Sequence, residues 1–295
     1  MQEAPLLYSK ASSKINLYLK ITARRPDRYH ELESLFLPLQ NPADDIAIDL
    51  EALPGAVTVG CSDVLLPGGL ENIAGKAADL WAKKSAVMPH WDINIVKNIP
   101  VAAGMGGGSS NAATVLKLLN EHYGNPLDAP ALAAAALELG ADVPFFLTPQ
   151  PAVMRGIGEI AEELDFELPQ LPIVLIAPGF PVSAAEGYSL MTPEKISPMS
   201  DDLRTRIMQC LRQSKLEELS SLLFNDLQDG VFRKYPLLDI LKNSALASGA
   251  LGCWMTGSGP TLFALYANKE AARNACSSLQ KSYPEFRIID TLQEN

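Results

Sequence analysis

The stretch Pro100-Val101-Ala102-Ala103-Gly104-Met105-Gly106-Gly107-Gly108-Ser109-Ser110-Asn111 decides how the rest of this chain is interpreted. Four of the five residues from 104 to 108 are glycine, which packs no side chain but allows positive φ and close approach of a ligand to the backbone. The stretch ends in good N-cap residues and runs into an amphipathic segment. Free N–H groups at a helix N-terminus form an anion site, usually for phosphate. A phosphate-binding loop is therefore predicted, the alternative being a flexible turn that is merely rich in glycine.

The common nucleotide-binding motifs do not match this loop. No lysine follows in the frame GxxxxGK[ST], so the loop is not a Walker A sequence. Ser109 occupies the place of the third glycine in GxGxxG. The P-loop and dinucleotide-binding folds are therefore disfavoured.

Periodicity outside the loop indicates the remaining elements. Apolar and polar residues alternate over 11–21, which predicts a strand with one face in the core. Lys14 and Asn16 would share the opposite face, away from the core. Apolar residues recur at helical spacing over 71–86 and 109–120. Further strands are predicted at 46–50, 93–96, 173–177, 251–255, 261–266 and 286–290, and further helices at 131–139, 202–213, 215–224, 235–248 and 269–280.

The chain changes character between residues 150 and 178, where four prolines surround an apolar run rich in β-branched residues. We place a domain boundary in the early part of this segment, which gives domains of residues 1–154 and 155–295. Strands and helices alternate in both halves without strict βαβ periodicity. The predicted class is α+β, in two domains.

Bulk composition excludes several kinds of partner. The 295 residues are 47% hydrophobic and 20% charged, which is typical of a globular protein with a sizeable core. A formal net charge of −10 repels phosphate backbones and anionic membranes. No signal peptide or membrane-spanning run is apparent. We expect a cytoplasmic protein that binds neither nucleic acid nor membrane, as a monomer or weak homodimer. Four isolated cysteines are expected as free thiols: Cys61, Cys210, Cys253 and Cys276.

Five motifs, in order along the chain, resemble those of the GHMP kinases. They are Ser13-Lys14-Ile15-Asn16-Leu17-Tyr18-Leu19, Asp27-Arg28-Tyr29-His30, the glycine loop, Leu139-Gly140-Ala141-Asp142-Val143-Pro144-Phe145-Phe146 and Thr256-Gly257-Ser258-Gly259-Pro260-Thr261. The set is most similar to the branch that phosphorylates cytidine diphosphate-linked methylerythritol in non-mevalonate isoprenoid synthesis. The resemblance implies a two-domain GHMP kinase fold with the active site in the cleft between domains. It also implies ATP with Mg²⁺ as phosphoryl donor and the 2-hydroxyl of the sugar alcohol as acceptor.

Two residues are the candidates for catalysis. Phosphoryl transfer to an alcohol needs an oriented hydroxyl and stabilised charge on the transferring group. The resemblance implies that Asp142 accepts the hydroxyl proton and that Lys14 stabilises charge beside it. From the residues alone, Asp142 could equally cap a short helix starting at Val143-Pro144. Lys14 could be a solvated strand lysine, as Lys20 is expected to be.

Five residues are the candidates for binding the substrate, and the fifth of them, Ser183, is considered below with Ala184. Asn16 shares the strand face of Lys14 and could reach the same substrate, the alternative being a surface amide. The resemblance implies that Tyr29 and His30 hold the cytosine ring and that Tyr188 stacks on it.

Two positions depart from the pattern of the branch. Arg28 replaces a glycine, which puts cytidine recognition in doubt if that glycine needs positive φ. Ala184 stands where the branch has a threonine whose hydroxyl lies near the substrate. Ser183 is the candidate to replace that hydroxyl if the backbone shifts.

The nucleotide is assigned by resemblance as well. The phosphates would be wrapped by Gly104, Gly106, Gly107, Gly108, Ser109 and Ser110. Asn72 and Lys97 match positions near adenine and ribose. No acidic magnesium ligand of the family has a counterpart here, so the metal ligands are unknown. The segment Gly257-Ser258-Gly259 is either a simple hairpin turn or, by resemblance, also closes the active site.

Three other functions stay open at this point. The chain could be another GHMP kinase of the homoserine or mevalonate type, although Tyr29-His30 and the triple glycine favour the cytidyl branch. It could be a non-catalytic sensor that binds nucleotide through the same loop, although both Lys14 and Asp142 are present. A nucleic-acid-binding module is the poorest candidate, because no basic stripe is visible.

Overall fold

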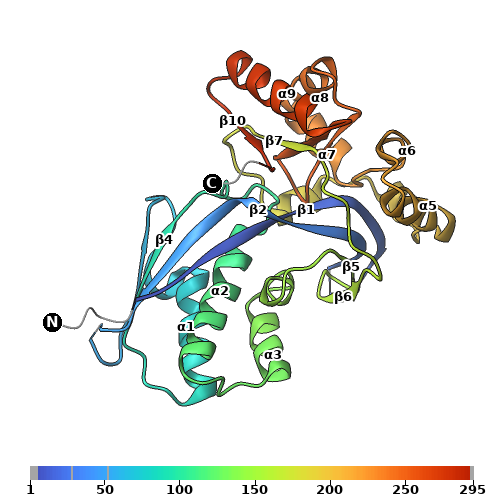
Figure 1. The fold of residues 1–295 in the computed structure, drawn as a ribbon. Helices are drawn as coiled ribbons and strands as arrows, with labels where there is room; N and C mark the ends of the chain where they lie inside the picture. The colour runs from blue at the N-terminus through green and yellow to red at the C-terminus, as the bar shows by residue number, and fades with distance from the viewer. Residues whose placement is uncertain (1–5, 28, 52, 293–295) are drawn as a thin grey trace. The chain divides into compact units, whose positions relative to one another are not determined.

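The computed structural model describes residues 6–27, 29–51 and 53–292 (Figure 1). Its contacts group into two compact units. One holds the residues up to Ser13 with 42–99 and 106–149, and the other holds 14–41, 100–105 and 150–295. The long strands β1 (Leu6–Arg24) and β2 (His30–Asp49) contribute residues to both. The units thus interleave along the chain, and the division into functional domains at residues 154 and 155 stays a prediction.

The first unit packs helices against strands. Its elements are β3 (Val57–Cys61), η1 (Gly69–Glu71), α1 (Ile73–Ser85), β4 (Trp91–Val96), α2 (Gly107–His122), α3 (Ala129–Leu139) and η2 (Pro144–Leu147). Strand β4 pairs antiparallel with β2, Ile95 opposite Ile46, and parallel with β3. Helices α1 and α2 lie side by side (Figure 1). Trp81 of α1 and Trp91 of β4 are fully buried and meet edge to face, with ring centroids 5.6 Å apart.

Helix α2 begins inside the glycine stretch. Gly106 is its N-cap, with φ +73°, a left-handed conformation that costs glycine no steric strain. Ala112, Val115, Leu116 and Leu119 are all fully buried. The helical spacing of the apolar residues therefore predicted the correct buried face, and the helix is longer than predicted by two residues at each end.

The second unit contains a four-stranded antiparallel sheet in the order β10-β7-β9-β8. Its strands are β7 (Ile173–Ala177), β8 (Gly252–Met255), β9 (Leu262–Leu265) and β10 (Arg287–Asp290), and its helices and 3₁₀ turns are α4 (Ala184–Ser189), η3 (Pro193–Lys195), α5 (Asp201–Arg212), α6 (Leu216–Ser220), α7 (Gln228–Lys234), α8 (Leu237–Ala247) and α9 (Lys269–Ser282). In the same unit, β5 (Ala152–Arg155) pairs with β2 and with β6 (Ile160–Glu163).

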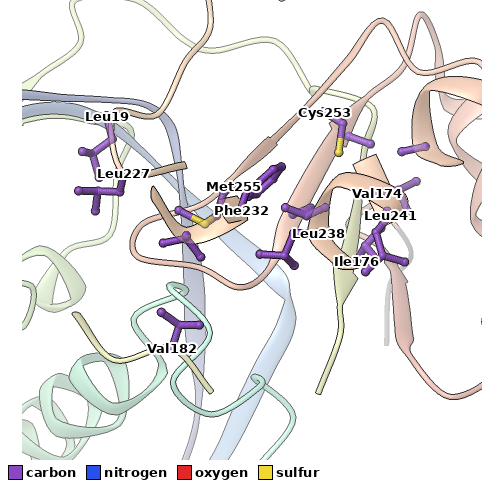
Figure 2. Packing of buried hydrophobic residues seen from close by; sticks show 14 of the residues in the cluster. Leu19, Val174, Ile176, Val182, Leu227, Phe232, Leu238, Leu241, Cys253 and Met255 are labelled. Carbon is purple, nitrogen blue, oxygen red and sulfur yellow. The ribbon is translucent and has the colours of Figure 1, made fainter. Parts of the chain in front are cut away.

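One hydrophobic cluster holds the second unit together. Figure 2 shows Leu238 and Leu241 of α8 among Val174 and Ile176 of β7. All five residues of β7 are buried, and β7 contacts α9 as well as its paired strands β9 and β10. An unbroken apolar run instead of alternation is typical of a strand buried in this way.

The predicted class and most predicted elements are confirmed, with identifiable exceptions. The helix predicted over 215–224 is only the short α6. Strands β3, β5 and β6 and helices α4 and α7 were not predicted, because all are short and carry weak periodic signals. In α7, Gly230 weakens the helical signal, yet a Cβ there would lie 2.0 Å from the carbonyl oxygen of Leu190. Close packing therefore requires glycine at this point.

Two further findings concern composition. Within the described ranges, no helix combines the length and the apolar character needed to cross a bilayer. All four cysteines are free thiols as expected. Cys210 and Cys253 are buried as small hydrophobic residues, whereas Cys61 and Cys276 are half-buried.

Adjacent residues of α8 test the importance of the cluster. Leu241→Ala should lower the free energy of unfolding by about 2–5 kcal/mol, because it removes buried methyl groups and leaves a cavity. Ile240→Ala, at a side chain that is 55% exposed, should change it by less than about 1 kcal/mol. Urea unfolding followed by circular dichroism measures both. Equal losses would show that the cluster does not determine the stability of this unit.

Candidate active site

Lys14 lies on β1 in the second unit and is buried, with only 4% of its surface exposed. Its Nζ donates to Asn16 Oδ1 at 2.7 Å and to the Gly104 carbonyl oxygen at 3.1 Å. The ammonium also lies 4.6 Å from the ring centroid of Phe36, within reach of a cation–π interaction. The prediction that this strand face lies outside the core is wrong, and so is the solvated-lysine alternative. A charge this buried must be matched by acceptors.

Asn16 is buried beside Lys14, so the surface-amide alternative is also wrong. Its Nδ2 donates to Ser34 Oγ at 2.8 Å. Its backbone N–H donates to the hydroxyl of Thr256 at 2.9 Å. The structure therefore brings Lys14 and Asn16 together, and adds Ser34 and Thr256 as neighbours.

Two glycine backbones meet beside this pair. Gly104 has φ +75°, and a Cβ there would lie 2.2 Å from the carbonyl oxygen of Thr256. Gly257 has φ +54°, and its Cβ would lie 2.8 Å from the Gly104 oxygen. Both positions therefore require glycine. Asn225 fixes the second one, because its Nδ2 donates to the carbonyl oxygens of Met255 and Gly257. The segment around Gly257 joins β8 and β9, so it is a hairpin turn, packed against the glycine stretch.

In the first unit, a buried ion pair lies beside the start of α2. Asp44 is completely buried and accepts from the backbone N–H groups of Asn98 and Ile99 at 2.7 Å each. It also accepts from Lys97 Nζ and, at 2.9 Å, from Asn111 Nδ2. A Cβ added at Gly107 would lie 3.2 Å from Lys97 Nζ. Lys97, which was predicted to lie near the adenine and ribose, therefore has its ammonium next to the glycine loop.

The N-terminus of α1 lies beside the same loop. Asn72 is the N-cap of α1: its Oδ1 accepts from the Ala74 N–H at 3.0 Å and its Nδ2 donates to the Pro67 oxygen. A Cβ at Gly108 would be in ordinary contact, 3.6 Å from Ile73 Cγ2. Two helix N-termini thus converge near Gly108, and this concentrates positive backbone dipoles there.

The two serines of the loop differ in exposure. Ser109 is half-buried, whereas Ser110 is buried. Ser110 lines a small polar cavity of about 140 Å³ together with Ser12 and Thr114. The exposed Gly108 and the half-buried Ser109 are therefore more accessible to a phosphate group than the buried Ser110 is.

Asp142 lies in a turn between α3 and η2 of the first unit and is half-buried. Val143, and not Asp142, is the N-cap of η2, and the Val143 side chain makes no capping bond. The predicted role of Asp142 as a base stays a prediction.

Two of the three predicted cytosine residues are stacked on each other. The rings of His30 and Tyr188 have centroids 5.2 Å apart and an interplanar angle of 15°. Burial, followed by the positive charge of Arg24, lowers the pKa of His30 below its usual value near 6.5, which favours a neutral imidazole at pH 7. Tyr29 is 61% exposed. Arg28 lies outside the described residues.

The hydroxyl of Ser183 is used locally. Ser183 is the N-cap of α4, and its Oγ accepts from the Glu186 N–H at 3.1 Å. Ala184 is the first residue of that helix. A shift of the backbone at Ser183 would break this cap, so the hydroxyl would have to serve a substrate from its present place, with its proton and its second lone pair available.

Sequence reasoning missed several buried polar residues of the second unit. Glu33 accepts from Tyr18 at 3.0 Å and from two nitrogens of Arg204 at 2.7 Å each. Burial opposes ionisation of Glu33, but the bonds and charge of Arg204 outweigh it and lower its pKa. Lys20, expected to be solvated, instead pairs with Asp226 at 3.0 Å. For Glu33, an acidic residue inside the apolar strand β2 was the available signal.

No group of three or more His, Cys, Asp or Glu side chains suited to a metal ion occurs in the part of the chain that the structure describes. Mg²⁺ commonly keeps water and is bound mainly through substrate phosphates. The residues present therefore fit a magnesium ion that arrives on a nucleotide better than one held by a cage of protein ligands.

Comparisons with known proteins agree with this geometry. Residues 72–150 match the GHMP kinases N terminal domain, and residues 207–285 match GHMP kinases C terminal. The 4-diphosphocytidyl-2-C-methyl-D-erythritol kinase of Geobacter sp. (strain M21) is 40% identical over 92% of this chain and 94% of its own length. A crystal structure of 4-(cytidine 5'-diphospho)-2C-methyl-D-erythritol kinase is 33% identical, with a TM-score of 0.79 over 96% of this chain and 97% of that one. Homoserine kinase from Cytophaga hutchinsonii, 18% identical with a TM-score of 0.75 over 98% and 94%, shares the fold.

The buried ion pair beside the loop can be tested directly. Asp44→Ala leaves the Lys97 ammonium and two backbone N–H groups buried without this acceptor, so the free energy of unfolding should fall by about 3–5 kcal/mol. The control is Asp201→Asn, which breaks a pair whose carboxylate is 92% exposed and should cost less than about 1 kcal/mol. Urea unfolding compares the two. Similar small losses in both variants would contradict a structural role for the Asp44 pair.

Proposed function

Because the chain belongs to the GHMP kinase family, we propose that it transfers the γ-phosphoryl group of ATP to the 2-hydroxyl of 4-diphosphocytidyl-2-C-methyl-D-erythritol, a step in isoprenoid precursor synthesis. The observation that carries this proposal is the identity with kinases of that name over nearly their whole length. The homoserine-type and mevalonate-type alternatives have less support, since those structures share the fold at much lower identity. A non-catalytic sensor has less support too, since the buried Lys14 and its acceptors are intact.

Lys14 acts in this proposal as the positive group at the reacting centre. Its ammonium is shielded from water, where a charge interacts more strongly than in bulk solvent. It is fixed by Asn16 Oδ1 and the Gly104 oxygen, so little reorganisation is needed when negative charge develops on the attacking oxygen and the transferring phosphoryl group.

Asp142 is the proposed base. A carboxylate that holds the 2-hydroxyl orients it toward the γ-phosphate and takes its proton as the oxygen–phosphorus bond forms. The bond from the γ-phosphorus to the β–γ bridging oxygen breaks, and ADP leaves. Support comes from the position of Asp142 in the fourth motif, directly before the residue that caps η2.

MgATP is the proposed second substrate, with its phosphates on the residues around the start of α2. Gly104, Gly106, Gly107 and Gly108 would offer backbone N–H groups, and Ser109 and Ser110 hydroxyls. Lys97 next to Gly107 adds positive charge, partly offset by Asp44. Asn72 would contribute through the helix N-terminus that it caps. Magnesium bound to the nucleotide supplies neutralisation of the β- and γ-phosphate oxygens.

The cytosine is proposed to bind at His30 and Tyr188, with Asn16, Tyr29 and Ser183 as further contacts to the substrate. Stacked aromatic rings offer the flat apolar face that a pyrimidine prefers. A neutral His30 can donate one hydrogen bond and accept another. The alanine at position 184 would be compensated by the hydroxyl proton of Ser183.

The remaining parts of the proposal are less specific. The enzyme would function in the cytoplasm, as a monomer or weak homodimer, through an N-terminal domain of residues 1–154 and a C-terminal domain of residues 155–295. Nucleic acid and membranes would not be partners, because a net charge of −10 repels both.

Replacing the proposed base should separate chemistry from binding. Asp142→Asn should lower kcat by about 10²–10⁴-fold, since an amide cannot accept the proton, while the KM for ATP stays near the wild-type value. Coupled detection of ADP gives the rates, and ³¹P NMR identifies the phosphorylated hydroxyl. Asp79→Asn, which removes a surface carboxylate of α1, is the control for charge. A kcat within a few-fold of wild type in Asp142→Asn would exclude it as the base.

Cytosine stacking should appear in the substrate KM alone. Tyr188→Leu should raise the KM for the cytidyl substrate by about 10-fold or more, because base–aromatic stacking contributes about 1–3 kcal/mol. The KM for ATP should not change, and Tyr188→Phe should behave as wild type because the ring is kept. Steady-state kinetics with each substrate varied measures this. An unchanged substrate KM in the leucine variant would mean that the base binds elsewhere.

A further inference from the structure

We propose that Ser34 is a positioning residue of the reaction: its hydroxyl fixes the amide of Asn16 so that the carbonyl oxygen faces the Lys14 ammonium. Ser34 lies on β2, opposite Met154 of β5, and is completely buried. The inference rests on the proposed role of Lys14 in the kinase reaction. The hydroxyl of Ser34 would act through Asn16, without contact to substrate.

The single proton of Ser34 determines what this hydroxyl can do for Asn16. Ser34 Oγ donates to the carbonyl oxygen of Tyr18 at 2.6 Å. With its proton used there, the oxygen can only accept, and it accepts from Asn16 Nδ2 at 2.8 Å. The nitrogen end of the Asn16 amide is thereby fixed toward β2.

The neighbours at the other end of the amide require the same orientation. Lys14 Nζ, which has donors and no acceptor, lies 2.7 Å from Asn16 Oδ1. The hydroxyl of Thr256 accepts from the Asn16 N–H at 2.9 Å, and its own proton faces Asn16 Oδ1 at 3.3 Å and the Gly104 oxygen at 3.5 Å. Every hydrogen bond around the side chain therefore agrees on one orientation.

Loss of the Ser34 oxygen would remove the acceptor on β2 that holds the nitrogen end of the Asn16 amide. Asn16 Nδ2 would then be buried without this acceptor, which is costly. Rotation of the amide by half a turn would place its NH₂ group against the ammonium, donor against donor. In either case, the Asn16 carbonyl oxygen is no longer held in one place as an acceptor for Lys14. The ammonium keeps the Gly104 carbonyl and the Phe36 ring, so it stays buried but is aimed less well.

The test compares two buried serines that each donate to a strand carbonyl. Ser34→Ala should lower kcat by about 10- to 100-fold, with the KM for ATP within about 2-fold of wild type. Ser34→Thr, which keeps the oxygen, should recover most of the rate. Ser13→Ala is the matched control. Ser13 is equally buried and donates to the Pro42 oxygen at 2.7 Å, so this variant should lose similar stability but keep its kcat.

A double-mutant cycle isolates the coupling to Asn16. If Ser34 acts through Asn16, adding Ser34→Ala to Asn16→Ala should slow the reaction no further. An equal slowing of wild type and Asn16→Ala by Ser34→Ala would overturn the proposal, as would a wild-type kcat in Ser34→Ala.

A readout without turnover keeps the inference separate from the proposed function. In ¹⁵N NMR, the Nδ2 protons of Asn16, identified by their loss in Asn16→Asp, should shift upfield and exchange faster with water in Ser34→Ala. If the wild-type chain does not phosphorylate the substrate, the proposed function fails, while this spectrum still tests the hydrogen bond. Unchanged Asn16 signals would overturn the positioning role.

Discussion

A buried ammonium group imposes the main constraint on the second unit. Lys14 must find acceptors inside the protein, because an unpaired charge at that depth would be prohibitively costly. The acceptors are an amide oxygen on the same strand and a backbone oxygen of the glycine stretch. The close approach of that backbone requires glycine at 104, and the turn packed on it requires glycine at 257. Much of the local sequence can be explained by the need to hold one charge in place.

The first unit solves a similar problem with the opposite sign. Asp44 is a buried carboxylate that is satisfied by two backbone N–H groups, an amide and the Lys97 ammonium. The backbone donors fix the chain that leads from β4 toward the glycine stretch, and the lysine lies beside Gly107. Charge pairing and loop geometry are thus coupled, since the same carboxylate sets both.

The proposed cytosine site depends on weaker and more local features. His30 and Tyr188 are stacked, and a lowered pKa of His30 favours a neutral ring. The substitution of alanine at position 184 leaves Ser183 as the nearby hydroxyl, but that hydroxyl also starts α4. If Ser183 contacts the substrate as proposed, recognition is tied to the integrity of a short helix, because the same hydroxyl caps α4.

The sequence by itself determined most of the elements and predicted a phosphate-binding loop, because these depend on neighbours along the chain. Helix α2 could be predicted from residues within a few positions of one another, and the motifs around Lys14 and Asp142 indicated the family. The burial of Lys14 and Asn16 could not be predicted, since alternation along β1 indicates two faces and does not show what covers the polar one.

Only the tertiary structure decided that Gly104, Ser34 and Thr256 would lie around this pair. Lys14 and Gly104 are 90 positions apart, and Asn16 and Thr256 are 240 apart. Hydrogen bonds of that kind depend on the packing of distant segments. They leave no periodic signal in either segment.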